Sequence, residues 1–182
     1  MLMSSEDLKL EMRFSGIRPT STNEMYRPAY TAKSHRSYLR KSSELVAFQS
    51  SCQENVKQYH EDIQEFVEKC KVKYPKYLGF SLKIVIGLPM DCMFYKKVTD
   101  DLRPIDTSNL IKSIEDIVSS AVGIDDKYNM KVSAEKILSS NKKDWEFFVV
   151  LIPLCYLDEL DLTEKDLENY ANDVRNSRKK KL

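Results

Sequence analysis

The sequence predicts an α+β fold: a single domain with a mixed sheet of about four strands, packed by one long helix and one shorter helix, plus a C-terminal helix. Three observations predict it. The 182 residues suit one domain that can bury a sizeable core. Several segments alternate between apolar and polar residues, as strands with one buried face do. Two others repeat apolar residues every three to four positions, as amphipathic helices do.

The chain begins with a predicted strand and a long basic loop. Apolar and charged residues alternate from Leu8 to Phe14, so this strand buries one face. The loop at 18–41 is longer than a plain connection requires. Its basic residues stand against one acid, Glu24, and are Arg18, Arg27, Lys33, Arg36, Arg40 and Lys41. Because tyrosines lie between these residues, the loop is either a nucleic-acid contact or a solvated connection.

A long helix and a second strand form the middle of the chain. Apolar residues keep helical spacing over 43–74, and acids gather on the opposite, solvated face. Pro75 ends this helix, and the alternation at 78–88 predicts a strand. Cys52 and Cys70 lie on the apolar stripe of the helix, where they are expected to be small reduced core residues. With no Cys-x-x-Cys pair, a zinc site is not expected.

A shorter helix is predicted at about 109–120, with polar residues around its first turn. Thr107 or Ser108 caps its start, and Gly123 marks its end. The polar set comprises Asp106, Ser108, Asn109, Lys112, Asp116, Asp125 and Asp126. Because a strand follows and turns the chain back, we expect Asp126 to approach Asp106. The alternative is an ordinary capped helix with solvated turns.

Two strands and a last helix are predicted at the end of the chain. The segments at 128–138 and 145–154 have strand patterns, and the polar turn between them indicates a hairpin. Thr163 and Asp166 resemble a capping box. They mark the start of a C-terminal helix with a basic tail at about 162–182. The whole of 1–182 is expected to form one domain.

Composition limits the classes of function. The residues are 42% hydrophobic and 31% charged, which describes a soluble globular protein. No run approaches the roughly 18 apolar residues of a membrane span, and the opening MLMSSEDLKL is too acidic for a signal peptide. We therefore expect a cytoplasmic protein without a membrane partner. With four glycines and no Gly-rich loop, a nucleotide-cradling motif is not expected either.

The polar set resembles the core motif of the RusA-type Holliday-junction resolvases, a family of small endonucleases. That motif runs roughly Asp-x-Asp-Asn-x-x-Lys, a helix, Asp-Asp and a strand. The matching residues are Asp106, Asn109, Lys112, Asp125 and Asp126. Ser108 stands where the family has its second aspartate. Upstream, the family's Pro-x-Ser-x-Asn with an aromatic, followed by Tyr-Leu, has its counterparts in Pro19, Ser21, Asn23, Tyr26, Tyr38 and Leu39.

The resemblance implies a Mg²⁺-dependent endonuclease, with Mn²⁺ as an alternative metal, that cuts four-way junctions or related branched DNA. It also implies a homodimer of phage or mobile-element origin that serves DNA recombination and repair. Its catalytic residues would be Asp106, Asp126 and Lys112, and its metal ligands would be Asp106, Asp126, Asp125 and Ser108. Asn109 and Asp116 would support them. The DNA-binding residues would be Arg18, Asn23, Arg27, Arg36, Arg40, Lys41, Lys96, Lys97 and Arg103.

Two other functions remain open. Ser108 removes a carboxylate, and Ile105 stands where the family commonly has a basic run. These departures motivate a catalytically weakened or inactive RusA-like protein that binds branched DNA or a host protein. The third interpretation, a structural α/β protein without a nucleic-acid partner, requires both motif regions to be coincidences.

Overall fold

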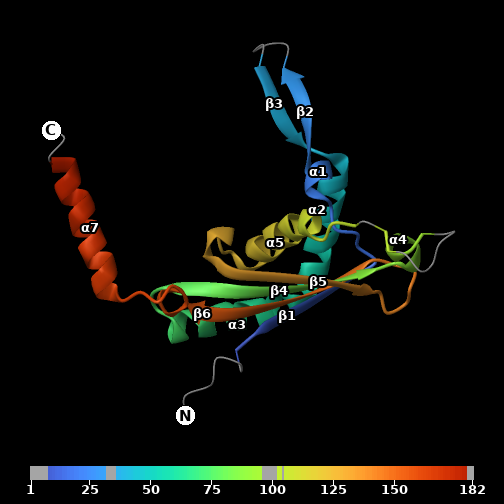
Figure 1. Cartoon of the computed structure of the whole chain (residues 1–182). Coiled ribbons are helices and arrows are strands. Elements are labelled where there is room, and N and C mark those ends of the chain that lie inside the picture. The colour runs from blue at the N-terminus through green and yellow to red at the C-terminus, as the bar shows by residue number, and fades with distance from the viewer. Residues whose placement is uncertain (1–7, 32–35, 96–101, 104, 180–182) are drawn as a thin grey trace.

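A mixed four-stranded sheet forms the centre of the computed structural model, which describes residues 8–31, 36–95, 102–103 and 105–179. Its strands, in the order β1-β6-β4-β5, are β1 (Leu10–Ser15), β6 (Glu146–Cys155), β4 (Leu78–Leu88) and β5 (Asn129–Leu138) (Figure 1). β6 runs antiparallel to both of its neighbours, whereas β5 is parallel to β4. The predicted α+β fold with a mixed sheet of about four strands is therefore confirmed.

The predicted hairpin of the last two strands is wrong, because β4 lies between β5 and β6. A helix separates β4 from β5 along the chain, and parallel neighbours need such a crossover connection. Once β5 occupies one edge of β4, the other edge is left for β6. Strands that are adjacent in sequence are thus not adjacent in the sheet.

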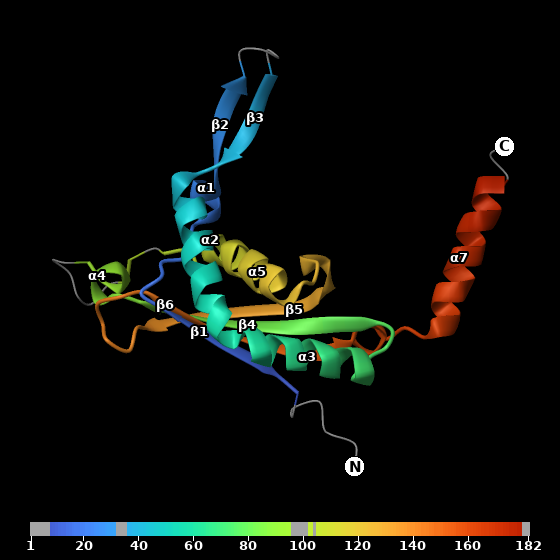
Figure 2. The ribbon, with the colours of Figure 1, turned by 180° about the vertical axis from the view of Figure 1, so that it is seen from behind.

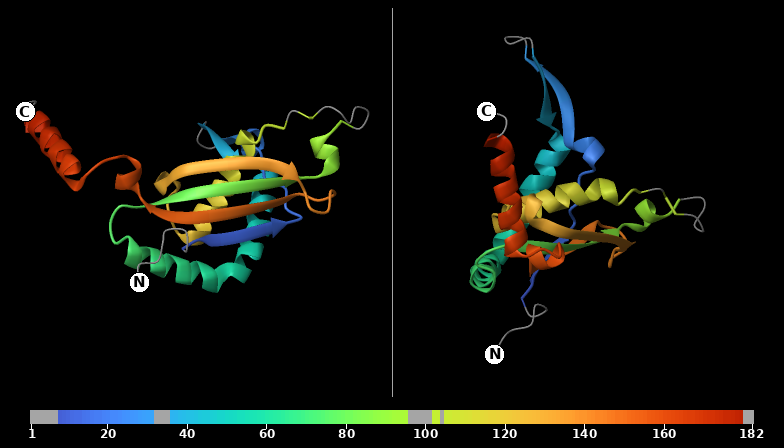
Figure 3. Two further views of the ribbon diagram at one scale, coloured as in Figure 1. Left: turned by 60° about the horizontal axis from the view of Figure 1, so that its bottom comes forward. Right: turned by 60° about the vertical axis from the view of Figure 1, so that its left-hand side comes forward.

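Three helices cover one face of the sheet, namely α2 (Ser43–Val56), α3 (His60–Lys73) and α5 (Ser108–Val122) (Figures 1 and 2). The core between the layers includes Phe14 and Phe147, whose rings stack with centroids 4.4 Å apart. Cys52 and Cys70 are buried in it, as predicted, and burial raises the pKa of each thiol to about 12. In the described part of the chain, no helix covers the opposite face (Figure 3).

The single long helix predicted over 43–74 is two helices joined by a 3₁₀ turn, η2 (Lys57–Tyr59). Figure 2 shows α2 and α3 running in different directions from this turn. Tyr59 anchors the bend to β1, because its hydroxyl accepts from Arg13 N at 2.9 Å and donates to Arg13 O at 3.1 Å. Both halves bury an apolar face, so the helical periodicity persists through the bend.

The prediction of a loop over 18–41 is wrong, because this segment contains a helix and two strands. A short helix α1 (Thr22–Met25) begins at a capping box of Ser21 and Glu24. It is followed by a separate two-stranded sheet of β2 (Tyr26–Thr31) and β3 (Arg36–Lys41). This hairpin rises away from the main sheet (Figure 1). Its base is closed by the hydrogen bond from Ser42 N to Met25 O, at 3.0 Å.

The last described segment of the chain is helical. After α6 (Tyr156–Glu159), the longer α7 (Glu164–Lys179) extends away from the sheet (Figures 1 and 3). The predicted capping box is present, since Asp166 Oδ2 accepts from Thr163 N at 2.8 Å and Thr163 Oγ1 accepts from Asp166 N at 3.3 Å. The remaining elements are α4 (Met90–Met93) and η3 (Asp126–Tyr128). Across the described residues, none of the helices has the length and apolarity to cross a bilayer.

Candidate functional site

Asp106 holds the start of α5 through both of its carboxylate oxygens. Oδ1 accepts from Ser108 N at 2.9 Å and from Ser108 Oγ at 2.6 Å, and Oδ2 accepts from Asn109 Nδ2 at 3.1 Å. The hydrogen bonds from the Ser108 hydroxyl and then from its N–H lower the pKa of Asp106. Thr107, a predicted cap, makes no capping side-chain bond, so the carboxylate one residue earlier caps the helix instead.

Asn109 connects the site to the short helix α1. Its Nδ2 donates to Asp106, while its Oδ1 accepts from Thr22 Oγ1 at 2.8 Å. Two hydrogen bonds through Asn109 thus connect Asp106 to α1. The hairpin β2–β3 follows α1 directly. This arrangement fits the supporting role expected of Asn109.

Lys112 lies in the second turn of α5 among three carboxylates. Its Nζ contacts Asp126 Oδ2, lies 2.9 Å from Asp116 Oδ1, and lies 3.8 Å from Glu115 Oε2. Partial burial acts to lower the pKa of Lys112, but the hydrogen bonds to Asp126 and Asp116 outweigh it and raise the pKa. Glu115 also accepts from Asn129 Nδ2 at 2.9 Å, which ties this group to β5. The lysine is therefore held as a cation.

The expected metal ligands divide between two places on α5. Asp106 and Ser108 lie at its start, and Asp126 contacts Lys112 one turn later. Asp125 is engaged elsewhere, because it caps η3 and pairs with Lys127 Nζ at 3.0 Å. Within 8–31, 36–95, 102–103 and 105–179, no three acids, histidines or cysteines gather into a group that could hold a metal ion. The oxygen donors themselves are hard ligands, which in chemistry fit Mg²⁺.

A cleft of about 480 Å³ opens beside Asp106. Its walls include Arg18 and Arg103, which the sequence predicts as DNA contacts, and Trp145, which sequence reasoning missed. The guanidinium of Arg18 lies 5.8 Å from the centroid of the Trp145 ring. Trp145 precedes β6, and only the order of strands in the sheet brings it to Asp106.

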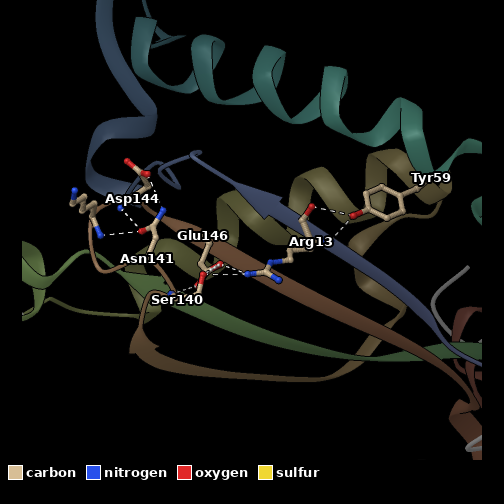
Figure 4. A network of polar contacts seen from close by, with 7 residues as sticks. Arg13, Tyr59, Ser140, Asn141, Asp144 and Glu146 are labelled. Atoms are coloured by element: carbon tan, nitrogen blue, oxygen red, sulfur yellow. Dashed lines mark hydrogen bonds and ion pairs between the residues drawn. The ribbon is translucent and has the colours of Figure 1, made fainter.

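A turn between β5 and β6 carries Trp145, and its polar contacts hold it in place (Figure 4). Glu146 accepts from Arg13 Nη2 at 2.6 Å and from Ser140 N at 2.6 Å. The Arg13 bond is the largest cause of a lowered pKa of Glu146. Gly87 lies opposite, and a Cβ there would come within 2.5 Å of Glu146 Cγ. Glycine thus leaves room for the carboxylate that fixes the turn.

Lys136 is a second residue that sequence reasoning missed. It lies on β5, donates from Nζ to Ile105 O at 3.3 Å, and its charge is one of the smaller causes that lower the pKa of Asp106. The alternation of β5 marks it as a strand residue, but only the parallel pairing of β5 with β4 places it beside the start of α5.

The predicted DNA contacts in 18–41 lie on α1 and the hairpin. Strand register sets Arg27 opposite Arg40, and both are exposed. Arg27 pairs with Glu44 Oε1 at 3.0 Å, and Lys41 Nζ donates to Gln49 Oε1 at 2.9 Å.

Three other predicted contacts are placed in part or not at all. Asn23 is exposed on α1, and its N–H donates to Ser21 Oγ at 3.3 Å. Arg36 begins β3, but its side chain, like the whole of Lys96 and Lys97, lies outside the described residues.

Comparisons with solved structures give weak likenesses. The chain is similar to 2C-methyl-D-erythritol 2,4-cyclodiphosphate synthase from Plasmodium vivax, with 13% identity over 81% of this chain and 97% of that one, at a TM-score of 0.29. It is also similar to the bifunctional IspDF from Campylobacter jejuni, with 10% identity over 82% of this chain and 46% of that one, at a TM-score of 0.24. TM-scores this low carry no argument about fold or function.

Comparison with curated proteins finds no match. In contrast, the model of the family described as Endodeoxyribonuclease RusA matches residues 21–144. That range is more than half of the chain and contains α1, the hairpin, Asp106, Lys112 and Asp126. The chain therefore belongs to the RusA endodeoxyribonuclease family, whose members resolve Holliday junctions.

Proposed function

We propose that this protein is a structure-selective endonuclease that cuts Holliday junctions or related branched DNA in recombination and repair. The observation that carries the proposal is the arrangement around the start of α5. Asp106 accepts hydrogen bonds from Ser108 and Asn109 in the first turn of α5. Asp126 contacts Lys112, which lies one turn later. These residues follow the order of the family motif, and the family match at 21–144 supports the same interpretation.

Mg²⁺, or alternatively Mn²⁺, would be held by Asp106 and Asp126 with the hydroxyl of Ser108, and Asp125 would assist. The chemistry supplied there by a bound ion would be polarisation of a phosphoryl oxygen and activation of a water molecule. Lys112 would contact the scissile phosphate. Its raised pKa keeps it protonated at neutral pH, so it can offset negative charge there. Asp116 orients the ammonium group from the next turn of the helix.

The exposed cations of the hairpin and the cleft would bind the DNA backbone. Arg27 and Arg40 lie opposite each other on β2 and β3, and like charges in that position repel. A phosphate between them would relieve the repulsion. Arg18 and Arg103 line the cleft beside Asp106, so they would bind the backbone nearer the site of cleavage.

Ser108 favours a second candidate function, a RusA-like protein that binds branched DNA or a host protein with weak or no cleavage. Its hydroxyl donates to Asp106 where the family has a further carboxylate. Even indirect changes at metal sites commonly cost about 10–100-fold in affinity or activity. Binding of branched DNA would then be retained while cleavage is weak or lost.

The deciding experiment compares a labelled four-way junction with a linear duplex of the same sequence, in Mg²⁺, in Mn²⁺ and in EDTA. The endonuclease predicts paired nicks near the crossover that require metal and spare the duplex. Asp126→Asn is the control, since it removes the charge and keeps the side-chain shape. A retained, uncut junction under every condition would favour the binder. The molecular mass in solution tests the homodimer that we propose alongside, because two sites would cut opposite strands.

A further inference from the structure

We propose that the cleft beside Asp106 is a subsite for one unpaired nucleotide of the DNA. In this proposal Trp145 stacks on the base, and Arg18 and Arg103 bind the flanking phosphates. The inference rests on the proposed function, because it takes DNA as the substrate. It adds a role for Trp145, which would distinguish branched DNA from linear duplex. A volume of about 480 Å³ lies within the range of clefts that hold small organic ligands.

Trp145 presents a fixed aromatic surface. Its carbonyl accepts from Gly16 N at 2.8 Å, which ties the residue to the end of β1. Part of the side chain packs against the core, and the rest lines the cleft. The turn before it is held by the Glu146 contacts shown in Figure 4. A ring that is already fixed loses little conformational freedom when a base stacks on it.

Arg18 lines the cleft beside Trp145, where it can bind a phosphate of the nucleotide whose base enters the cleft. Its guanidinium lies 5.8 Å from the ring centroid of Trp145, and its side chain is 59% exposed. It pairs with Glu24 only at 3.4 Å, which leaves most of its donors for another acceptor. Cations near an aromatic ring bind the backbone of a nucleotide whose base stacks on that ring.

Arg103 supplies a second cation that its surroundings hold in place. Its Nη1 donates to Asp91 O at 2.7 Å, and its guanidinium lies 6.0 Å from the centroid of the Tyr95 ring. Its backbone N–H donates to Met93 O at 2.9 Å. One guanidinium donor is used, and the planar fork has others for a phosphate.

The rest of the lining suits a base with its phosphates. Ile105 and Leu110 provide apolar contacts, and Asp106 is the only acid among the described lining residues, against Arg18 and Arg103. The apolar face of a nucleobase suits the apolar residues of the cleft, and the negative charge of each phosphate suits the two arginines.

This geometry would select DNA structure and not DNA sequence. Bases in an intact duplex are paired and stacked on their neighbours, so they cannot reach the ring without being unstacked. At a crossover the stack of base pairs is interrupted, so a base there can be unstacked into the cleft at a lower cost than a base inside a duplex. Every base has a π-face, so stacking tolerates any sequence. We therefore expect Trp145 to favour the crossover of a junction over linear duplex.

The test uses the fact that Trp145 is the one tryptophan of the chain. Its emission, excited where tyrosine does not absorb, reports this cleft alone. The protein is titrated in EDTA, so that no DNA is cut, with a four-way junction, a short single-stranded oligonucleotide and a linear duplex. The expected result is saturable quenching by the junction and the single strand and little change with duplex. Inorganic phosphate should leave the emission unchanged.

A pair of variants separates stacking from packing. Trp145→Phe keeps an aromatic ring and should keep most of the junction preference. Trp145→Leu keeps apolar bulk and should weaken junction binding by about 5- to 150-fold, the usual range when one base no longer stacks on an aromatic ring, while duplex binding stays the same. Labelled DNA reports binding for both variants. Thermal melts and circular dichroism must show that both are folded.

Arg18→Gln and Arg103→Gln should each lower the salt dependence of junction binding, whereas Lys69→Gln on α3 should not. If the junction binds but leaves the Trp145 emission unchanged, and Trp145→Leu binds it like the wild type, the subsite is wrong and the proposed function stands. If no DNA of any form binds, both fail together.

Discussion

Ser108 occupies the position at which the resemblance to the family motif predicts an aspartate, and its hydrogen bonds show what the serine does there. The hydroxyl and the N–H of Ser108 both donate to Asp106, and together they keep that carboxylate ionised. A carboxylate at position 108 would instead repel it. The serine thus places two hydrogen-bond donors beside Asp106 where an aspartate would add a second negative charge.

Placing an aspartate at position 108 tests the effect of the serine. Ser108→Asp is expected to raise the affinity for Mg²⁺ and the rate of junction cleavage, because it adds a hard oxygen ligand. The stability change should stay within about 1 kcal/mol, since aspartate suits the start of a helix. Metal titration calorimetry and single-turnover cleavage measure the two effects. Ser108→Ala, which removes the hydroxyl without adding charge, is the control. A wild type that cuts well and a Ser108→Asp variant that cuts no faster would make Ser108 a working part of an altered site.

Asp106 also predicts how the stability of the fold depends on pH. Its pKa is lower in the folded chain than the ordinary value. Its contribution to stability is therefore present above the unfolded pKa, and it is lost as the pH falls through the folded pKa. Asp106→Asn should melt at a lower temperature than the wild type near neutral pH, and the two curves should converge in acid. Glu68→Gln, on the exposed side of α3, is the matched control. A constant difference between the Asp106→Asn and wild-type curves down to acid would mean that the carboxylate charge is irrelevant there.

At the level of single residues, the sequence predicted the polar set but not its partners. Asp106, Lys112 and Asp126 follow from motif spacing. Their ion pairs and caps depend on how the chain returns after α5, which spacing alone does not fix. Trp145 and Lys136 come from β6 and β5, and only the sheet order brings them to Asp106.

Among the elements, the hairpin was the least predictable. Pro28 interrupts the alternation of β2, and the four residues AKSH between the strands contain none of the glycine or asparagine signals that mark tight hairpins. Helix periodicity, by contrast, predicted α5 well because its apolar face packs on the sheet. Strand periodicity predicted β4, β5 and β6 but not which of them pair, since alternation does not encode neighbours.

The charges of the hairpin give a prediction at the level of this element. Replacing Arg27, Arg40 and Lys41 together with glutamine should weaken junction binding. It should also reduce the slope of log affinity against log salt by roughly 0.9 for each phosphate that is no longer neutralised. The melting temperature should change little, because removal of the Arg27–Arg40 repulsion offsets the loss of the exposed Arg27–Glu44 ion pair. Fluorescence anisotropy at several salt concentrations measures the slope. The triple variant Lys57→Gln, Lys69→Gln, Lys71→Gln is the control for charge alone, and an equal reduction of the slope there would show that the hairpin has no special role.

Across the whole molecule, the sheet joins residues inside and outside the range that matches the family. β4 and β5 lie within 21–144, whereas β1 and β6 lie outside it, and β6 pairs with both β1 and β4. The catalytic candidates thus lie in the matched range, while the core beneath them needs both ends of the chain. Phe14 of β1 and Phe147 of β6 stack in that core.

The helix α7 stands apart from this core, which leads to a prediction about the molecule as a whole. Among the residues of α7 whose side chains are described, 164–174, none belongs to the buried core, and Tyr170 is 70% exposed. A chain ended after Leu162 should therefore melt within about 2–4 °C of the full chain, the shift that corresponds to about 1 kcal/mol at this size. Calorimetry measures the melting temperature, and light scattering measures the mass of both chains. If α7 covers a partner copy in the proposed homodimer, the shortened chain will have half the mass and a melting temperature lower by more than that margin. An unchanged mass with a large fall in melting temperature would instead mean that α7 stabilises its own chain.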